Sequence, residues 1–133
     1  MYQDNSNKFV AILNQKQTMG LLMNALAHTV AGLLSKQRAH LDQMEFLPYR
    51  DSEGVMDACI SRYPFIILKA KNGNQLRTVL QAAQDAGIPC NVFADSMLGT
   101  SAAEQLQKTR SANEAELDYI ALCLFGPLQI STT

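Results

Sequence analysis

The sequence Tyr119-Ile-Ala-Leu-Cys-Leu-Phe125 is a continuous apolar run that Gly126 and Pro127 close. Seven apolar residues without a polar break are typical of a strand that is covered on both faces. Three similar runs precede it along the chain, at Phe9–Leu13, Pro64–Ala70 and Cys90–Ala94. These four runs predict the strands of one sheet.

Helical signals separate the four runs. Apolar residues recur with helical spacing over residues 19–36 and 75–86, and Gly87 and Pro89 end the second of these helices. Residues 101–109 begin with a Ser-x-x-Glu capping box and predict a third helix. This alternation predicts an α/β fold, with a four-stranded or slightly larger, mixed and mainly parallel sheet that has helices on both faces.

The chain length suits one domain. We expect residues 1–133 to form a single domain with a polar tail at residues 1–7. Residues 39–61 interrupt the alternation, and within them the turn motif Asp51-Ser-Glu-Gly54 separates two short apolar runs. Pro48 restricts the first of these runs to an edge strand. We therefore expect residues 39–61 to be a hairpin or an irregular excursion.

Composition disfavours several functional classes. A net charge of −1 disfavours broad electrostatic binding of nucleic acid, although tRNA is not excluded by it. We expect no signal peptide, and no apolar run approaches the roughly 20 residues that span a bilayer. The three widely spaced cysteines, Cys59, Cys90 and Cys123, do not have metal-ligand spacing. We expect a cytoplasmic protein without metal, cofactor or membrane contact.

A second copy of the chain is the expected partner. Only 17% of the residues are charged, against 47% that are hydrophobic. Met19 and Met23 lie one helical turn apart on the first predicted helix, and methionine adapts to core and interface packing. These features predict a homodimer.

Lys16 and Asp95 are the candidate catalytic residues. Each follows a predicted strand, so both would project from the same edge of a parallel sheet, where α/β proteins bind ligands. In a cleft, a lysine and an aspartate can orient a carbonyl group and a nucleophilic water. The alternative is that both are solvated loop residues.

Three further residues are candidates for ligand binding. His28 lies among small apolar residues on the first predicted helix, where it is either a ligand contact or a histidine at the edge of the core. Gly20, at the start of that helix, allows close backbone approach, and Thr100 follows the strand that ends at Asp95. We expect Gly20 or Thr100 to form a wall of the site.

An ordered set of motifs resembles the archaeal and eukaryotic type of peptidyl-tRNA hydrolase. The opening of that family is similar to Lys8-Phe-Val-Ala-Ile-Leu-Asn-Gln-Lys16, Gly20 and Ala25-Leu-Ala-His28. Its later strands resemble Gly87-Ile-Pro-Cys-Asn-Val-Phe-Ala-Asp95 and Tyr119-Ile-Ala-Leu-Cys-Leu-Phe-Gly-Pro127. The resemblance implies the fold of that family and functional roles for Lys16 and Asp95.

The chain also departs from the family pattern. Family members carry further lysines around the glycine, but here the neighbours are Met19, Leu21 and Leu22. The segment after Asp95 is also different, because residues 101–109 predict an inserted helix. The chain therefore looks more like the bacterial relatives of that fold, whose function is unknown.

The resemblance implies a domain that binds a small or acyl-type ligand at the edge of Lys16 and Asp95, with ester hydrolysis as its possible reaction. Water would attack the ester carbonyl, Asp95 would orient or deprotonate that water, and Lys16 would stabilise the oxyanion. Two alternatives stay open. One is a non-catalytic binding or dimerisation module, and the other is a true peptidyl-tRNA hydrolase.

Overall fold

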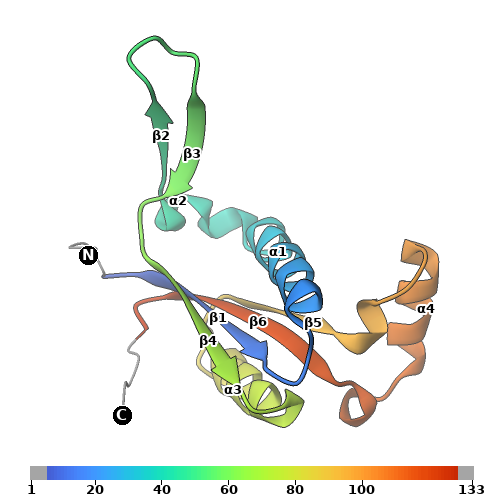
Figure 1. Cartoon of the computed structure of the whole chain (residues 1–133). Coiled ribbons are helices and arrows are strands. Elements are labelled where there is room, and N and C mark those ends of the chain that lie inside the picture. The colour runs from blue at the N-terminus through green and yellow to red at the C-terminus, as the bar shows by residue number, and fades with distance from the viewer. Residues whose placement is uncertain (1–5, 129–133) are drawn as a thin grey trace.

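A four-stranded mixed sheet with helices forms the body of the protein (Figure 1). The structure is a computed structural model, and it describes residues 6–128. The sheet has the order β4-β1-β6-β5. Its strands are β1 (Lys8–Asn14), β4 (Phe65–Ala70), β5 (Cys90–Ala94) and β6 (Tyr119–Gly126). The prediction of a mixed α/β fold, with its strands at the four apolar runs, is confirmed.

Strand β6 is the centre of this sheet. It pairs with β1 on one side and β5 on the other, and all eight of its residues are buried. Neighbouring strands satisfy both edges of its backbone, and helices cover its faces (Figure 1). Residues 119–125 can therefore be apolar on both faces.

The expectation of a mainly parallel sheet is wrong. Among the neighbouring strand pairs, only β1 with β4 is parallel, whereas β6 is antiparallel to both β1 and β5. The cause is the connection from β5 to β6, in which the backbone N–H of Asp95 donates to the carbonyl of Asp118 at 2.9 Å. The chain thus re-enters the sheet at the edge where the carboxyl end of β5 lies. Strand β6 therefore runs antiparallel beside β5.

The connection between β5 and β6 stays beside the sheet instead of crossing it. It comprises η2 (Asp95–Met97), α4 (Ala102–Ser111) and η3 (Glu114–Glu116). Helix α4 has no buried residue, and its one large apolar side chain, Leu106, is 55% exposed. A crossover helix needs an apolar stripe to bury against the sheet, and this helix does not have one.

Two long helices cover opposite faces of the sheet (Figure 1). Helix α1 (Met19–Lys36) packs mainly on β5 and β6, and helix α3 (Gly73–Asp85) packs on the other face. The α1 residues that it buries, at helical spacing, are Leu22, Ala25, Thr29 and Leu33. Asn72 caps α3 with its side chain, which accepts a hydrogen bond from Gln75 at 3.0 Å.

Residues 46–61 form a hairpin that projects away from the sheet (Figure 1). Its strands are β2 (Phe46–Arg50) and β3 (Asp57–Ser61), which pair in an antiparallel register. Two short helices, η1 (Arg38–His40) and α2 (Leu41–Met44), lead into it. Met44 is fully buried in the core and anchors the base of the hairpin.

Two glycines in helices provide a matched test of packing. A Cβ atom at Gly73 would lie 2.2 Å from Asp118 Oδ1 and 3.1 Å from the backbone nitrogen of Tyr119. At Gly20 a Cβ would meet nothing within 4 Å. We expect Gly73→Ala to lower the free energy of unfolding by about 1–3 kcal/mol. We expect Gly20→Ala to raise it by up to about 1 kcal/mol. Urea unfolding measures both, and equal effects would contradict this account of Gly73.

The three cysteines should differ in reactivity. Cys59 is exposed, whereas burial raises the pKa of Cys90 and raises that of Cys123 to about 12. Because the thiolate is the reactive form, we expect iodoacetamide to modify the native protein at Cys59 alone. Mass spectrometry should find all three sites modified after unfolding, and Cys59→Ser should abolish native labelling. Rapid native modification of Cys123 would contradict its burial.

Candidate functional site

Lys16 and Asp95 lie at the same edge of the sheet. Strands β1 and β5 run in the same direction, so their carboxyl ends share that edge, but β6 separates them. Two strand spacings place the backbones of β1 and β5 about 10 Å apart. Both side chains are exposed. The functional pairing of Lys16 with Asp95 stays a prediction.

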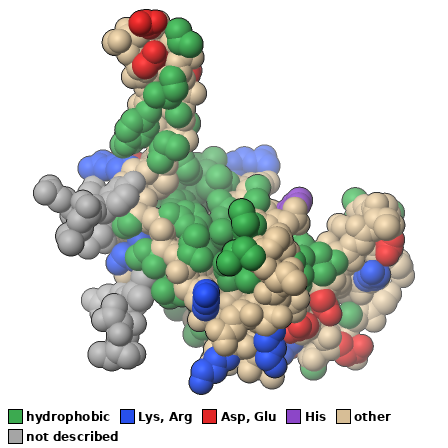
Figure 2. Space-filling model, viewed as in Figure 1, with side chains coloured by type: hydrophobic (Ala, Val, Ile, Leu, Met, Phe, Trp, Pro, Cys, Tyr) green, Lys and Arg blue, Asp and Glu red, His purple; other side chains and the backbone are tan. Residues whose placement is uncertain are grey.

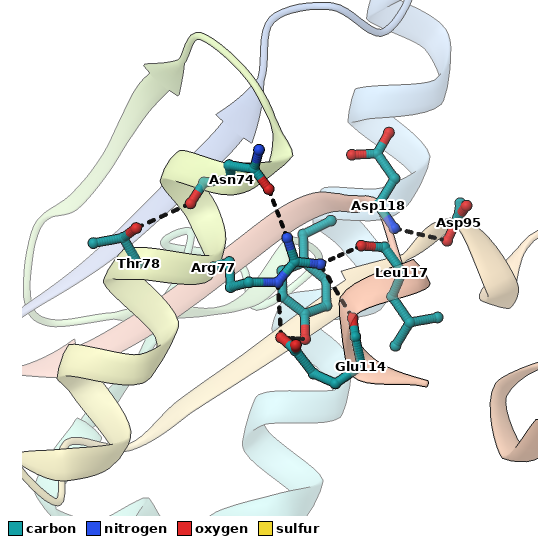
Figure 3. Close-up of polar contacts among 8 residues, drawn as sticks. Asn74, Arg77, Thr78, Asp95, Glu114, Leu117 and Asp118 are labelled. Carbon is teal, nitrogen blue, oxygen red and sulfur yellow. Dashed lines mark hydrogen bonds and ion pairs between the residues drawn. The ribbon is translucent and has the colours of Figure 1, made fainter. Parts of the chain in front are cut away.

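The carboxylate of Asp95 has a structural contact. Its Oδ1 accepts a hydrogen bond from the backbone N–H of Asp118 at 3.1 Å (Figure 3). With the backbone bond between the same two residues, this contact joins the end of β5 to the start of β6. One oxygen of Asp95 is therefore already used in holding the strands together.

Asn14 is a second polar junction that the sequence interpretation missed. It is 1% exposed, and its Nδ2 donates to the carbonyl of Tyr119 at 3.0 Å. Its Oδ1 accepts from the backbone N–H of Lys16 at the same distance. Asn14 thereby fixes the turn that carries Lys16. The only signal for it is one amide residue at the end of an apolar run.

Arg77 forms a clamp between α3 and the segment before β6 (Figure 3). Its Nε donates to Glu114 Oε1 at 2.8 Å and its Nη1 to Asn74 Oδ1 at 2.6 Å. Its Nη2 donates to the carbonyls of Glu114 and Leu117. The guanidinium also lies 4.9 Å from the ring centre of Tyr119. Because Arg77 uses four of its five N–H donors inside the protein, the adjacent hollow of 280 Å³ is a weak candidate for ligand binding.

The clamp changes the acidity of its members. The hydrogen bond from Arg77 holds the pKa of Glu114 below its ordinary value, and a bond from the Tyr119 hydroxyl at 3.1 Å adds to this effect. Burial raises the pKa of Tyr119, and the carboxylate of Glu114 raises it further. At neutral pH the clamp therefore contains an ionised Glu114, an ionised Arg77 and a protonated Tyr119.

A larger groove lies between α1, β5 and the segment from η2 to α4. Its volume is 520 Å³, within the range of small-molecule sites. Phe93, Met97 and Leu98 supply its apolar surface. The residues that line it are Asn24, His28, Thr29, Asn91, Val92, Phe93, Met97, Leu98, Gly99 and Gln105.

The position of Asn91 in this groove depends on a glycine. Asn91 Nδ2 donates to the backbone carbonyl of Thr29 at 3.0 Å. A Cβ atom at Gly32 would lie 2.6 Å from that same nitrogen, so only glycine admits the amide against α1. Asn91 Oδ1 accepts no hydrogen bond within residues 6–128. Since no buried side-chain oxygen in that range lacks a partner, this oxygen is not fully enclosed by the protein.

Three other side chains add hydrogen-bonding groups to the groove. Asn24 and His28 make no hydrogen bond with any described residue, and the His28 ring lies 6.1 Å from that of Phe93. Gln105 donates from Nε2 to the carbonyl of Gly99 at 3.3 Å, which leaves its Oε1 free to accept. In the described part of the chain, no lysine, arginine, aspartate or glutamate lines the groove.

The predicted ligand-binding residues divide between the groove and its surroundings. His28 lines it. Thr100 is adjacent to the lining residue Gly99, but its hydroxyl donates to Glu104 Oε2 at 2.7 Å and lowers the pKa of that carboxyl. Gly20 is exposed in the first turn of α1 and does not line the groove.

Residues 6–128 contain neither a candidate metal site nor a candidate membrane span. No group of three or more His, Cys, Asp and Glu residues is arranged there to hold a metal ion. None of the helices in this range combines the length and apolarity that crossing a bilayer requires.

Comparisons with known proteins give a family and a fold. The family described as a protein of unknown function (DUF2000) matches residues 7–130. A solved structure of a protein of unknown function from Agrobacterium tumefaciens is similar, with a TM-score of 0.75 and 18% identity. The match covers 92% of this chain and 87% of the other, and at this identity it shows the fold alone. No curated protein matches the chain.

These findings overturn the resemblance to peptidyl-tRNA hydrolases. Both the family and the solved structure are uncharacterised, and nothing in either indicates a peptidyl-tRNA hydrolase. The motifs behind the resemblance were apolar strands, a glycine and strand-ending polar residues. The fold itself requires such features, as the junctions at Asn14 and Asp95 illustrate.

The clamp predicts a contribution to stability in acid. Because the pKa of Glu114 is lower in the folded state, its contribution is complete above the ordinary value of 4.5 and is lost as pH falls through the folded value. We expect urea unfolding to show a smaller acid-induced loss of stability for Glu114→Gln than for the unmodified protein. Asp85→Asn removes the same charge at an exposed position outside the clamp and is the control. Equal acid sensitivity of all three proteins would contradict this contribution.

Proposed function

The chain belongs to the DUF2000 family of unknown function, and we propose that it is a binding domain for a small, uncharged polar molecule. The site is the groove between α1, β5 and the segment from η2 to α4. One observation carries the proposal. Hydrogen-bonding groups of Asn24, His28, Asn91 and Gln105 that are free within the described residues surround an apolar surface.

The lining of the groove defines the chemistry of the ligand. Carboxamides and an imidazole can each donate or accept hydrogen bonds without imposing a strong charge requirement. A fixed carboxylate or phosphate on the ligand would find no lysine or arginine among the described lining residues. The ligand therefore has neutral polar groups, such as amides, hydroxyls or ring nitrogens.

The ligand also has an apolar part. Phe93, Met97 and Leu98 line the same groove, and Met97 and Leu98 belong to the segment that follows β5. An apolar group that packs there contributes about 25 cal/mol for each Å² removed from water. The polar groups across the groove then set its orientation.

Ester hydrolysis by Lys16 and Asp95 has less support. Asp95 contributes an oxygen to the junction with Asp118, and Lys16 is exposed in a turn. Neither residue lines the groove of 520 Å³. We therefore propose ligand binding without assigning a reaction.

We place this function in the cytoplasm. All three cysteines are free, and Cys59 is exposed. An exposed free thiol suits a reducing compartment.

A thermal-shift screen tests the proposed site. A library would contain neutral amides, nucleobases and polyols, together with carboxylates and phosphates of matched size. A neutral ligand at about 100 times its Kd adds about 2.7 kcal/mol to stability, which raises the Tm by roughly 10 °C. We expect such shifts of Tm from neutral compounds. The His28→Ala variant should lose them, whereas the control His40→Ala, outside the groove, should keep them.

A second variant separates the site from general stability. Gly32→Ala should displace the Asn91 amide and weaken binding of the same compound at least about tenfold, because it removes one acceptor. Calorimetric titration measures the affinity. Binding that is unchanged in both His28→Ala and Gly32→Ala would overturn the proposed site. Shifts from the charged compounds alone would overturn the proposed ligand class.

A further inference from the structure

The hairpin has an apolar face that the other residues in the range 6–128 leave open. Its register pairs Leu47 with Ile60 and Tyr49 with Ala58, so these four residues share one face. Leu47 is 38% exposed, Tyr49 47% and Ile60 51%. A two-stranded hairpin alone is at best marginally stable in water, so this face requires a covering surface.

The base of the hairpin is fixed to the body. Glu45 pairs with Arg62 at 3.0 Å and also accepts a hydrogen bond from the Tyr63 hydroxyl. The backbone N–H of Arg62 donates to the carbonyl of Glu45 at 2.9 Å. With Met44 fully buried beside these contacts, the hairpin is held pointing away from the sheet (Figure 1). It therefore cannot cover its own face by folding back.

The sheet has a complementary open half. The register of β1 with β4 places Phe65 and Ile67 on the same face as Phe9, the face on which α1 lies. Helix α1 packs mainly on β5 and β6, so Phe65 is 39% exposed and Ile67 53%. Among the described residues, no helix covers the β4 half of that face.

One flank of α1 extends this open surface. Met19 and Met23 are 63% and 65% exposed, and Asn24 and His28 lie on the opposite flank beside the ligand groove. Figure 2 shows hydrophobic side chains along the hairpin and gathered over the body below it. The same copy thus presents an apolar projection and an apolar half-sheet.

We propose that a second copy of this chain covers these surfaces, so that the hairpin of each protomer packs on the open half-sheet of its partner. A two-fold dimer needs a surface complementary to itself, and here one chain carries both an apolar projection and an open apolar half-sheet. The seven side chains are about half exposed and together offer on the order of 500–700 Å² per protomer. This area approaches the roughly 800 Å² per partner of a stable interface. The seven are Leu47, Tyr49, Ile60, Phe65, Ile67, Met19 and Met23.

Charges at the two ends of the proposed contact are complementary. Asp51 and Glu53 are exposed at the tip of the hairpin. Lys69 follows Ile67 on the same face of β4 and is also exposed. The tip of one protomer would then lie near the basic end of the partner's strand, so the same chain supplies both of the opposite charges that the contact uses.

Sedimentation velocity at protein concentrations up to tens of micromolar tests the proposal. We expect the full chain to sediment as a particle of twice 14.6 kDa. Ile67→Glu on the sheet and Ile60→Lys on the hairpin should each raise the dimer Kd by roughly 30-fold or more. Leu106→Glu, which places the same charge on the exposed α4, is the control and should leave the Kd unchanged.

Mixing Ile60→Lys with Ile67→Glu tests the reciprocal arrangement. In a heterodimer of the two variants, one contact is unmodified, and the other sets the introduced lysine of one protomer against the introduced glutamate of its partner. Heterodimers should therefore form at concentrations where each variant alone is monomeric. Circular dichroism verifies that both variants are folded, and position 60 lies outside the main sheet.

Three outcomes would contradict this assembly. A monomer at all concentrations, or a dimer that both variants leave intact, would overturn the proposal. A mixture of the two variants that stays monomeric would overturn the packing of hairpin on sheet.

Discussion

The pair of hydrogen bonds between Asp95 and Asp118 sets the direction of β6, and the arrangement of the sheet depends on that direction. Because the chain returns where it left, β6 fits between β1 and β5 and becomes the most buried strand. Both long helices then have one apolar strand to pack against, from opposite faces. The same junction leaves the segment from η2 to α4 beside β5, where it forms a wall of the groove.

The strands and long helices could be predicted because their signals are local. Residues 119–125 are apolar throughout, and the helices carry their periodicity within a few turns. The direction of β6 could not be read from such a signal, because it depends on whether α4 packs on the sheet. One sequence feature does indicate that α4 does not cross the sheet. Leu106 is its single large apolar residue, whereas a crossover helix needs a full apolar stripe.

The candidate site was only partly predictable for a different reason. His28 stood out as a titratable residue on an apolar helix, and it does line the groove. Asn24, Asn91 and Gln105 come from three separate elements and form no motif, because uncharged amides are common on protein surfaces. The sequence signal for Lys16 and Asp95 is that each follows a strand, and the polar junctions of the sheet explain residues at such positions as well.

The contact between Gly32 and Asn91 has a consequence for how sequences of this fold can diverge. The two positions share one small volume, so any gain in side-chain size at position 32 requires a loss at position 91. A larger residue at position 32 clashes with the Asn91 amide. The clash is avoided when a smaller residue replaces Asn91 at the same time. Relatives should therefore change these two residues together, and a lineage that exchanges the glycine also gives up the amide oxygen in the groove. Covariation of the pair would then separate members of the family that keep this binding chemistry from those that have replaced it.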